Sequence, residues 1–491
     1  RSVVKYDILA SKVYKRAWRV AVKPFEDPKM SLGVAVFLNI FLLTNGLPVQ
    51  ILDEFNGSNN TGIVETIHGS PKLNTKHLRL LRGQKLSQLH KPMEGLNDVE
   101  GTYEADMKLT PLQAVEIMEG SKTLDGTGRS KRKVVSNTIY KWPKGTVMFE
   151  FSKYNVLPEN IQRTVLSAME YWETVTCLRF RERTAELEKE VGHSDFILFS
   201  KGPGCSSAIG RMGGPQEITI SESCNNKVTI AHEIGHSIGF YHEQSRPDRD
   251  YFVEIIRTNI KPGYEEDFKK YEAGMEIGVR EPYDIGSAMH YGPTWFSKDE
   301  KSHTIEPKDK GLIGVMGQRE ELSFMDIKTA NDFYKCNEGC TNNLECKNGG
   351  YVGPNCACVC PSGLTGRTCD DVKRGTPGCG GILSGASGTF TTPNFPGSYP
   401  DNADCYWLVQ VPQASEITVT FDNFEMEDDE TCYYDWLEIR KYGLLLAGPK
   451  FCGNGPSGPI VFIGQSLMFH FHTDDGYGFK GFRASYTVRP K

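Results

Sequence analysis

The stretch HEIGHSIGFYHEQSRPDRD, residues 232–250, places three histidines and a glutamate within eleven positions. Its pattern is HExxHxxGxxH, in which His232 and His236 are four residues apart. Residues at this spacing share one face of a helix, so both imidazoles can point at a single metal ion. The alternative is a polar surface segment whose histidines gather by chance. The complete string is much more specific than its first half, and it favours the metal site.

The residues between and after these histidines fit the same interpretation. Glu233 is rotated about a quarter turn from His232 on a helix, so it faces a water molecule at the metal and not the metal itself. Gly239 ends the helix and can adopt the positive φ that turns the chain back, which brings in His242. Three neutral imidazoles leave a coordination position open, as in catalytic zinc sites. Glu233 would then be the general base that accepts the proton of that water.

Length, charge and cysteine content limit the class of protein. A chain of 491 residues is expected to form two to four domains. A net charge of −6 is small for this length and argues against a general nucleic-acid binder. The 14 cysteines begin only at Cys177, and eleven of them lie from Cys336 onward. An even, clustered set of cysteines is typical of disulfides formed in an oxidising compartment.

A targeting signal begins at Met30, where the chain reads MSLGVAVFLNIFLLTNGLPVQ. Residues 30–48 have the features of a secretory signal peptide: a basic flank, a short apolar stretch and small residues after it. The apolar stretch is shorter than the roughly 20 residues that cross a bilayer, so we expect a secreted protein without a stable membrane span. An anchor formed by residues 32–47 is the alternative. Residues 1–29 form an upstream segment of uncertain status.

Residues 49–132 are polar, lack cysteine and are predicted to be a propeptide. Two glycosylation sequons begin at Asn56 and Asn59. The segment ends in Arg129-Ser-Lys-Arg132, which has the form cut by secretory-pathway convertases. A basic run can also be solvated surface. The adjacent change in sequence character favours cleavage after Arg132.

The remainder of the chain predicts three kinds of structure. Apolar residues at helical spacing in residues 158–175 predict a helix, and alternating runs at 146–152, 195–200 and 216–221 predict strands of a mixed α+β domain. A second helix should begin after Asn225 or Asn226 and stop at Gly239. Residues 340–369 contain six cysteines and too few apolar residues for a core. Alternating runs from Cys379 onward predict an all-β sandwich.

The motif HExxHxxGFxHExxRxDRD, together with Ser287-Ala-Met289-His-Tyr291, resembles the astacin family of zinc endopeptidases within the metzincin clan. The resemblance implies that His232, His236 and His242 bind zinc and that Met289 forms a floor beneath it. It implies that Tyr291 is a further zinc ligand, which swings away and stabilises the oxyanion. It also implies that Glu243 meets the N-terminal ammonium freed near Lys133.

The propeptide carries a second resemblance. Tyr103-Glu-Ala-Asp106 is similar to the family motif FxGD, whose aspartate takes the open zinc position in the zymogen. The sequence departs from it with Tyr103 for Phe and Ala105 for Gly, and an ordinary solvated aspartate is the alternative. The stretch CSSAIGRMGG, residues 205–214, resembles the family's edge strand, to which extended peptides add by backbone hydrogen bonds.

The resemblance extends to the C-terminal modules. It implies a protease domain at 133–336, an EGF-like module at 337–370, a linker at 371–378 and a CUB domain at 379–488. The disulfides it implies are Cys177–Cys336, Cys205–Cys224, Cys340–Cys356, Cys346–Cys358, Cys360–Cys369, Cys379–Cys405 and Cys432–Cys452. In the CUB domain Glu427, Asp435 and Asp474 either bind calcium or are solvated acidic residues. The EGF-like and CUB modules are expected to contact extracellular matrix or a protein partner.

The sequence therefore predicts a multidomain protein: an α+β metzincin protease domain, a disulfide-rich EGF-like module and an all-β CUB sandwich. The predicted function is that of a secreted zinc endopeptidase, made as a zymogen, which hydrolyses extracellular proteins. The alternative is an extracellular binding scaffold with an inactive protease domain. Such a scaffold would tolerate loss of the base or of a zinc ligand, and every one of these residues is present.

Overall fold

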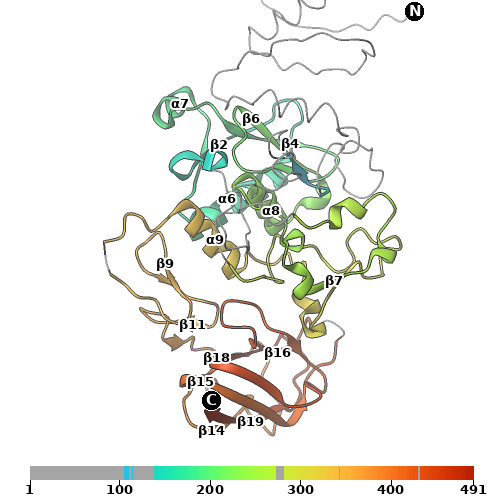
Figure 1. The fold of residues 1–491 in the computed structure, drawn as a ribbon, viewed down its shortest axis with the longest axis vertical. Helices are drawn as coiled ribbons and strands as arrows, with labels where there is room; N and C mark the ends of the chain where they lie inside the picture. The colour runs from blue at the N-terminus through green and yellow to red at the C-terminus, as the bar shows by residue number, and fades with distance from the viewer. Residues whose placement is uncertain are drawn as a thin grey trace, which may run out of the picture. The chain divides into compact units, whose positions relative to one another are not determined.

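The computed structural model describes residues 104–109, 113, 138–271, 281–341, 343–429 and 432–490. The predicted signal peptide, Asn56, Asn59 and the cleavage site at Arg132 lie outside these residues. Along the chain the described elements form a mixed group of helices and strands up to Cys336, a small cysteine-rich group, and an all-β group (Figure 1). This succession confirms the predicted fold class.

The N-terminal group contains a four-stranded parallel sheet with the order β3-β2-β4-β6. Its strands are β2 (Thr146–Phe151), β3 (Arg179–Glu182), β4 (Phe196–Lys201) and β6 (Pro215–Ile220), which confirms the three strands predicted from alternation. Parallel neighbours need crossover connections. Helix α6 (Glu159–Val175) connects β2 with β3, α7 (Ala185–Val191) connects β3 with β4, and a segment without a helix connects β4 with β6.

Helix α6 packs against α8 (Lys227–Ser237), which carries the histidine motif (Figure 1). The predicted apolar face of α6 is confirmed, because Ile161, Val165, Met169 and Trp172 are all buried. The indole of Trp172 donates a hydrogen bond of 3.0 Å to the carbonyl of Ala231 in α8. This contact fixes the position of α8 along α6 at the residue before the first histidine of the motif.

Helix α9 (Phe324–Tyr334) begins with a capping box formed by Ser323 and Asp326. The buried carboxylate of Asp326 also accepts hydrogen bonds from the Ser287 hydroxyl, at 2.6 Å, and from the Ala288 amide, at 2.8 Å. The N-terminus of α9 therefore holds the turn that leads into Met289. Beyond the other end of α9, the Cys177–Cys336 disulfide ties the chain to the segment that follows α6.

The other elements of this domain are short. A two-stranded parallel pair is formed by β1 (Met107–Lys108) and β5 (Ser207–Ala208), and an antiparallel pair by β7 (Val253–Ile255) and β8 (Ile305–Pro307). The 3₁₀ helices are η1 (Thr138–Tyr140), η2 (Pro143–Gly145), η3 (Glu222–Cys224), η4 (Glu243–Ser245), η5 (Arg249–Tyr251), η6 (Arg257–Asn259), η7 (Glu265–Phe268) and η8 (Lys310–Val315).

The cysteine-rich group consists of two small hairpins. Strands β9 (Tyr351–Val352) and β10 (Cys358–Val359) form the first, and β11 (Leu364–Thr365) and β12 (Asp371–Val372) form the second. Three disulfides hold these hairpins. Across the described residues, all seven disulfides join the same cysteines as the family resemblance implies, and no described cysteine is free.

The C-terminal group is a seven-stranded β-sheet network. Its strands are β13 (Gly381–Leu383), β14 (Ser387–Thr391), β15 (Asp404–Glu425), β16 (Trp436–Ile439), β17 (Lys450–Phe451), β18 (Ile460–His472) and β19 (Gly481–Pro490). The alternating sequences at 406–411 and 416–421 both belong to β15. A register shift between Gln410 and Ser415 lets this one long strand bend while it continues to pair with β18.

None of the helices in the described part of the chain combines the length and the apolar run that a membrane crossing requires.

The contacts of Asp326 lead to a stability prediction. Replacing Asp326 with Asn removes the charge and puts an amide donor beside the donors from Ser287 and Ala288, so we expect a loss of about 2 kcal/mol in the free energy of unfolding. Urea denaturation followed by circular dichroism measures it. Asp332→Asn, on the exposed side of the same helix, is the control and should cost under about 0.5 kcal/mol. Equal effects of the two changes would contradict the role of Asp326.

Candidate metal centre and active site

Helix α8 brings the first two histidines to one buried face. Asn226 caps the helix by accepting hydrogen bonds from the amides of Val228 and Thr229, at 2.8 and 3.0 Å. Of the two expected caps, the structure selects Asn226. Both His232 and His236 are buried, and their Nε2 atoms lie 3.0 Å apart. The predicted i, i+4 arrangement is therefore present.

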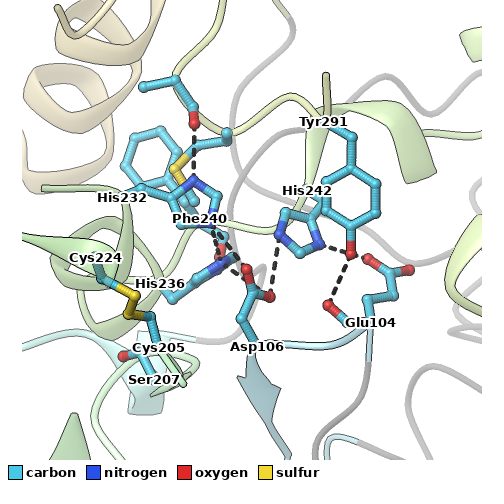
Figure 2. Close-up of polar contacts among 12 residues, drawn as sticks. Glu104, Asp106, Cys205, Ser207, Cys224, His232, His236, Phe240, His242 and Tyr291 are labelled. Atoms are coloured by element: carbon cyan, nitrogen blue, oxygen red, sulfur yellow. Dashed lines mark hydrogen bonds and ion pairs between the residues drawn. A yellow bond between two sulfur atoms is a disulfide. The ribbon is translucent and has the colours of Figure 1, made fainter. Parts of the chain in front are cut away.

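The chain turns back after α8 and returns the third histidine. Gly239 has φ = 116°, the conformation expected of it, which a residue with a Cβ adopts only with strain. His242 then lies with its ring centroid 4.8 Å from that of His236. One ligand atom from each of the three histidines and one from Asp106 lie within 4.8 Å of one another (Figure 2).

Each imidazole has its Nδ1 atom engaged away from the cluster. Nδ1 of His232 lies 2.8 Å from the carbonyl of Ala288, and Nδ1 of His236 lies 2.9 Å from the carbonyl of Phe240. Nδ1 of His242 lies 2.9 Å from a carboxylate oxygen of Glu104. An acceptor at Nδ1 requires the proton to be there, which leaves the Nε2 lone pair for a metal. Three such nitrogens with one carboxylate oxygen suit zinc.

Asp106 occupies the fourth corner of the cluster. Its two carboxylate oxygens lie 3.2 Å from Nε2 of His232 and from Nε2 of His242, respectively. Asp106 Oδ1 and His242 Nε2 are both buried and make no hydrogen bond. These two atoms lie 3.2 Å apart, and a cation between them would explain why both are buried without a hydrogen bond. The donor set thus fits the metal that the sequence predicts.

Glu233 lies beside the cluster and not within it. Its side chain is 2% exposed, and its Oε2 atom is buried without a hydrogen-bond partner. Burial, together with the nearby charge of Asp106, raises the pKa of Glu233 well above its ordinary value. A carboxylate with a raised pKa and a free oxygen facing a pocket is suited to accept a proton.

The segment 287–291 passes beneath and beside the histidines. A Cβ on Gly235 would lie 3.0 Å from the sulfur of Met289, so the glycine of HEIGH allows α8 to approach that side chain closely. The ring of Tyr291 lies 4.7 Å from that of His242, and its hydroxyl donates a hydrogen bond of 2.8 Å to the carbonyl of Glu104. The tyrosine is therefore held at the cluster by the backbone carbonyl of Glu104 (Figure 2).

Arg246, which follows His242, forms buried ion pairs. Arg246 contacts Glu243 at 3.0 Å and both carboxylate oxygens of Asp248, also at 3.0 Å. The carboxylate of Glu243 additionally accepts the backbone amide of Asp284, at 2.8 Å. Residue 133 lies outside the described residues, so the expected contact between Glu243 and a new N-terminus stays a prediction.

Residues 104–108 cross this site as a turn at Glu104–Asp106 followed by the short strand β1. Strand β1 pairs in parallel with β5, and Lys108 lies 3.6 Å from Glu217. Strand β5 belongs to the loop that was expected to bind extended peptides. Glu104 and Ala105 have φ values of 47° and 68°. Ala105, which stands where the family motif has glycine, thus occupies a conformation that glycine adopts with less strain.

Arg319 is a site residue that sequence reasoning missed. It lines a pocket of about 430 Å³ together with Asp106, His232, Glu233 and Trp295. Its Nη1 atom donates to the carbonyls of His290 and Gln318, whereas its Nη2 atom is buried without a hydrogen-bond partner. Burial lowers the pKa of the guanidinium to about 10. No sequence spacing links an isolated arginine to the histidine motif, and only the fold brings it there.

A second group of potential ligands lies in the C-terminal domain. Oxygens of Glu427, Asp435 and Asp474 lie within 4.8 Å of one another. Tyr399 donates a hydrogen bond of 2.6 Å to Asp435, whose pKa is raised by burial. The structure therefore brings together the three residues that were expected to bind calcium, and the binding of calcium there stays a prediction.

Comparison with known proteins agrees with this geometry. A family model described as astacin, a peptidase family, matches residues 134–335. The chain therefore contains an astacin domain. A CUB model matches residues 379–486, which confirms the predicted C-terminal module. The astacin match covers every histidine of the cluster, Glu233 and Tyr291.

Curated relatives extend the likeness beyond the astacin domain. Blastula protease 10 of Paracentrotus lividus is 38% identical over 79% of this chain and 64% of the relative. Zinc metalloproteinase nas-30 of Caenorhabditis elegans is 37% identical over 69% of this chain and 44% of the relative. This chain thus spans less than two thirds of the length of these relatives. Among solved structures, the hatching enzyme HCE-1 of medaka is 30% identical, covering 44% of this chain and 98% of that one, with a TM-score of 0.35.

The cluster leads to a prediction about metal content. We expect the purified astacin domain to retain one zinc per chain after dialysis and His242→Ala to retain far less, because removal of one of three nitrogen ligands opens the site. Elemental analysis by mass spectrometry measures this ratio. His303→Ala is the control, since His303 pairs with Glu306 at 3.0 Å outside the cluster. Full zinc retention by His242→Ala would show that this residue is no ligand.

Proposed function

We propose that this chain is a secreted zinc endopeptidase, made as a zymogen, that cleaves extracellular proteins. The observation that carries the proposal is the convergence of three imidazole Nε2 atoms beside the buried carboxylate of Glu233. The astacin match and relatives named zinc metalloproteinases support the same activity. The alternative of an inactive binding scaffold is disfavoured because no catalytic residue is lost.

The proposed mechanism assigns one task to each side chain. His232, His236 and His242 would hold zinc, which when bound supplies a Lewis acid that acidifies water and polarises a peptide carbonyl. Glu233 accepts a proton from the attacking water and later donates it to the leaving amine. The hydroxyl of Tyr291 donates a hydrogen bond to the oxyanion of the tetrahedral intermediate. Burial of Glu233 keeps this proton transfer apart from bulk solvent.

Latency follows from the contacts of the propeptide. The carboxylate of Asp106 fills the position that substrate would need, and the carbonyl of Glu104 engages the hydroxyl of Tyr291. Strand β1 also pairs with β5, the strand on which an extended substrate would lie. Cleavage after Arg132 would allow all three contacts to be released together.

The pocket also supports a preference for acidic substrates. The Nη2 atom of Arg319 is buried without a partner in the pocket that contains Glu233. A carboxylate of a substrate side chain beside the cleaved bond would satisfy this donor with a charge-assisted hydrogen bond. We therefore propose that the enzyme favours Asp or Glu next to the scissile bond.

The modules after the protease domain support an extracellular location. Seven disulfides are typical of an oxidising compartment. We propose that Glu427, Asp435 and Asp474 bind calcium, since oxygen ligands suit that ion and the Oε2 atom of Glu427 is buried without a hydrogen-bond partner. The EGF-like and CUB modules would then bind extracellular matrix or a protein partner.

The first experiment measures hydrolysis of a mixed quenched-peptide library by the chain cut after Arg132. We expect activity after cutting only, its loss on chelation and its recovery with added zinc. Glu233→Ala should lower kcat/KM at least about a hundredfold, because the general base is removed. Glu222→Ala, an exposed glutamate paired with Lys201, is the control and should be fully active. Absence of cleavage by folded, zinc-loaded, cut protein would favour the scaffold alternative.

The second experiment tests the role of Arg319. For Arg319→Gln we expect kcat/KM to fall at least about tenfold for peptides with Asp beside the scissile bond, and much less for matched Ala peptides, because one charge-assisted hydrogen bond is lost. Lys261→Gln removes another cation that lines the same pocket and should leave the Asp-to-Ala ratio unchanged. A proportional fall for both peptides would mean that Arg319 only supports the pocket wall.

A further inference from the structure

The third histidine differs from the other two in the source of its Nδ1 partner. His232 and His236 donate to the carbonyls of Ala288 and Phe240, which belong to the astacin domain. His242 donates to the carboxylate of Glu104, which belongs to the propeptide. Figure 2 shows Glu104 on the far side of the His242 ring from the cluster. One of the three outer contacts of the metal centre therefore comes from a segment that activation would remove.

The side chain of Glu104 is fully buried in this position. Its exposed fraction is 0%, and one oxygen accepts both Nδ1–H of His242, at 2.9 Å, and the hydroxyl of Tyr271, at 2.8 Å. Burial of a carboxylate costs free energy unless it is hydrogen-bonded, and these two donors offset part of that cost. The other oxygen, Oε1, is buried without a hydrogen-bond partner. Both of these hydrogen bonds are thus accepted by Oε2, the oxygen that faces His242.

The propeptide backbone places two carboxylates on opposite nitrogens of one ring. Asp106 lies 3.2 Å from Nε2 of His242, and Glu104 lies 2.9 Å from Nδ1. The left-handed conformations of Glu104 and Ala105 make the tight turn between these side chains. In an ordinary extended strand, two side chains at this spacing would also point to one side of the strand. They could not, however, reach both nitrogens of the His242 ring.

A carboxylate and a carbonyl at Nδ1 have different effects on a metal ligand. The carboxylate forms a charge-assisted hydrogen bond, which increases the electron density that the imidazole presents at Nε2. Outer partners of this kind orient the ring and raise its basicity, and their mutation lowers metal affinity about 10- to 100-fold. Glu104 is therefore in a position to strengthen the hold of His242 on zinc.

We propose that Glu104 is a removable outer partner of the metal centre, which tightens zinc binding in the zymogen and is withdrawn when the propeptide leaves. This proposal rests on the proposed zinc site and deepens it. Glu104 is a positioning residue that acts through His242. It makes zinc retention depend on the propeptide through an outer contact that is additional to the direct contact of Asp106.

The experiment measures zinc release from the full uncut chain. All proteins carry Glu233→Ala to prevent self-cleavage, are loaded with one zinc per chain and are mixed with a chromogenic chelator. We expect Glu104→Gln, which keeps the shape of the side chain but removes its charge, to release zinc about tenfold faster than the parent. In the cobalt-loaded proteins we expect the same substitution to shift the visible absorption bands of the metal.

Two controls isolate the contact with His242. Tyr271→Phe removes the other donor to the same carboxylate oxygen and should change the zinc release rate less than about twofold, because the Nδ1 contact stays. After cleavage at Arg132 and removal of the propeptide, the parent and Glu104→Gln proteins are identical in sequence and must release zinc equally. Glu104→Asp, whose shorter side chain retracts the carboxylate, provides a second variant if Glu104→Gln does not fold.

The outcomes separate this inference from the proposed function. Equal release rates for the uncut parent and folded Glu104 variants would overturn the role of Glu104 while leaving the zinc site intact. A failure of every form to bind one zinc would instead overturn the metal centre itself. A faster release from Glu104→Gln with an unchanged cobalt spectrum would also contradict the proposal, because it would indicate a loosened propeptide and not an altered ligand.

Discussion

The hydrogen bonds at the Nδ1 atoms of the three histidines are the constraint on which the site depends. A histidine can offer Nε2 to a metal only when its proton is held at Nδ1, and each ring here has an acceptor at that position. The acceptor for His232 comes from the segment that carries Met289, and the acceptor for His236 comes from the turn after Gly239. The geometry of the cluster therefore depends on the placement of two backbone segments outside α8, as well as on the helix itself.

The segment that carries Met289 and helix α8 are fixed by contacts that a motif does not reveal. Asp326 at the start of α9 holds the turn at Ser287 and Ala288, and the Cys177–Cys336 disulfide connects the end of α9 with α6. Because Trp172 in α6 is hydrogen-bonded to Ala231, the same helix also positions α8. The segment that carries Met289 and helix α8 are thus connected to one another through the core. This connection explains how imidazole rings from α8 and from the chain after it can converge.

Local patterns in the sequence predicted much of this arrangement because they depend on helix and strand periodicity. The buried face of α6, a cap at Asn225 or Asn226 and the positive φ of Gly239 all follow from residues that are close in the chain. The contacts of Arg319 and Glu104 could not be predicted in this way. Arg319 reaches the pocket from a loop 77 residues after His242 (319 − 242), and Glu104 lies 138 residues before it. No period or spacing encodes such contacts, which depend on the tertiary fold.

The proposed activation would remove some of the contacts of the cluster and leave others. The carbonyl partners of His232 and His236 belong to the astacin domain and would remain, whereas Asp106 and Glu104 would depart with the propeptide. Tyr291 would lose the carbonyl of Glu104 and could then turn its hydroxyl toward substrate. A propeptide that only blocked the cleft would not need to contact His242 both at Nε2, through Asp106, and at Nδ1, through Glu104. Under the proposed function, these contacts on both nitrogens of one ring would let the segment act on the metal centre as well as on access to it.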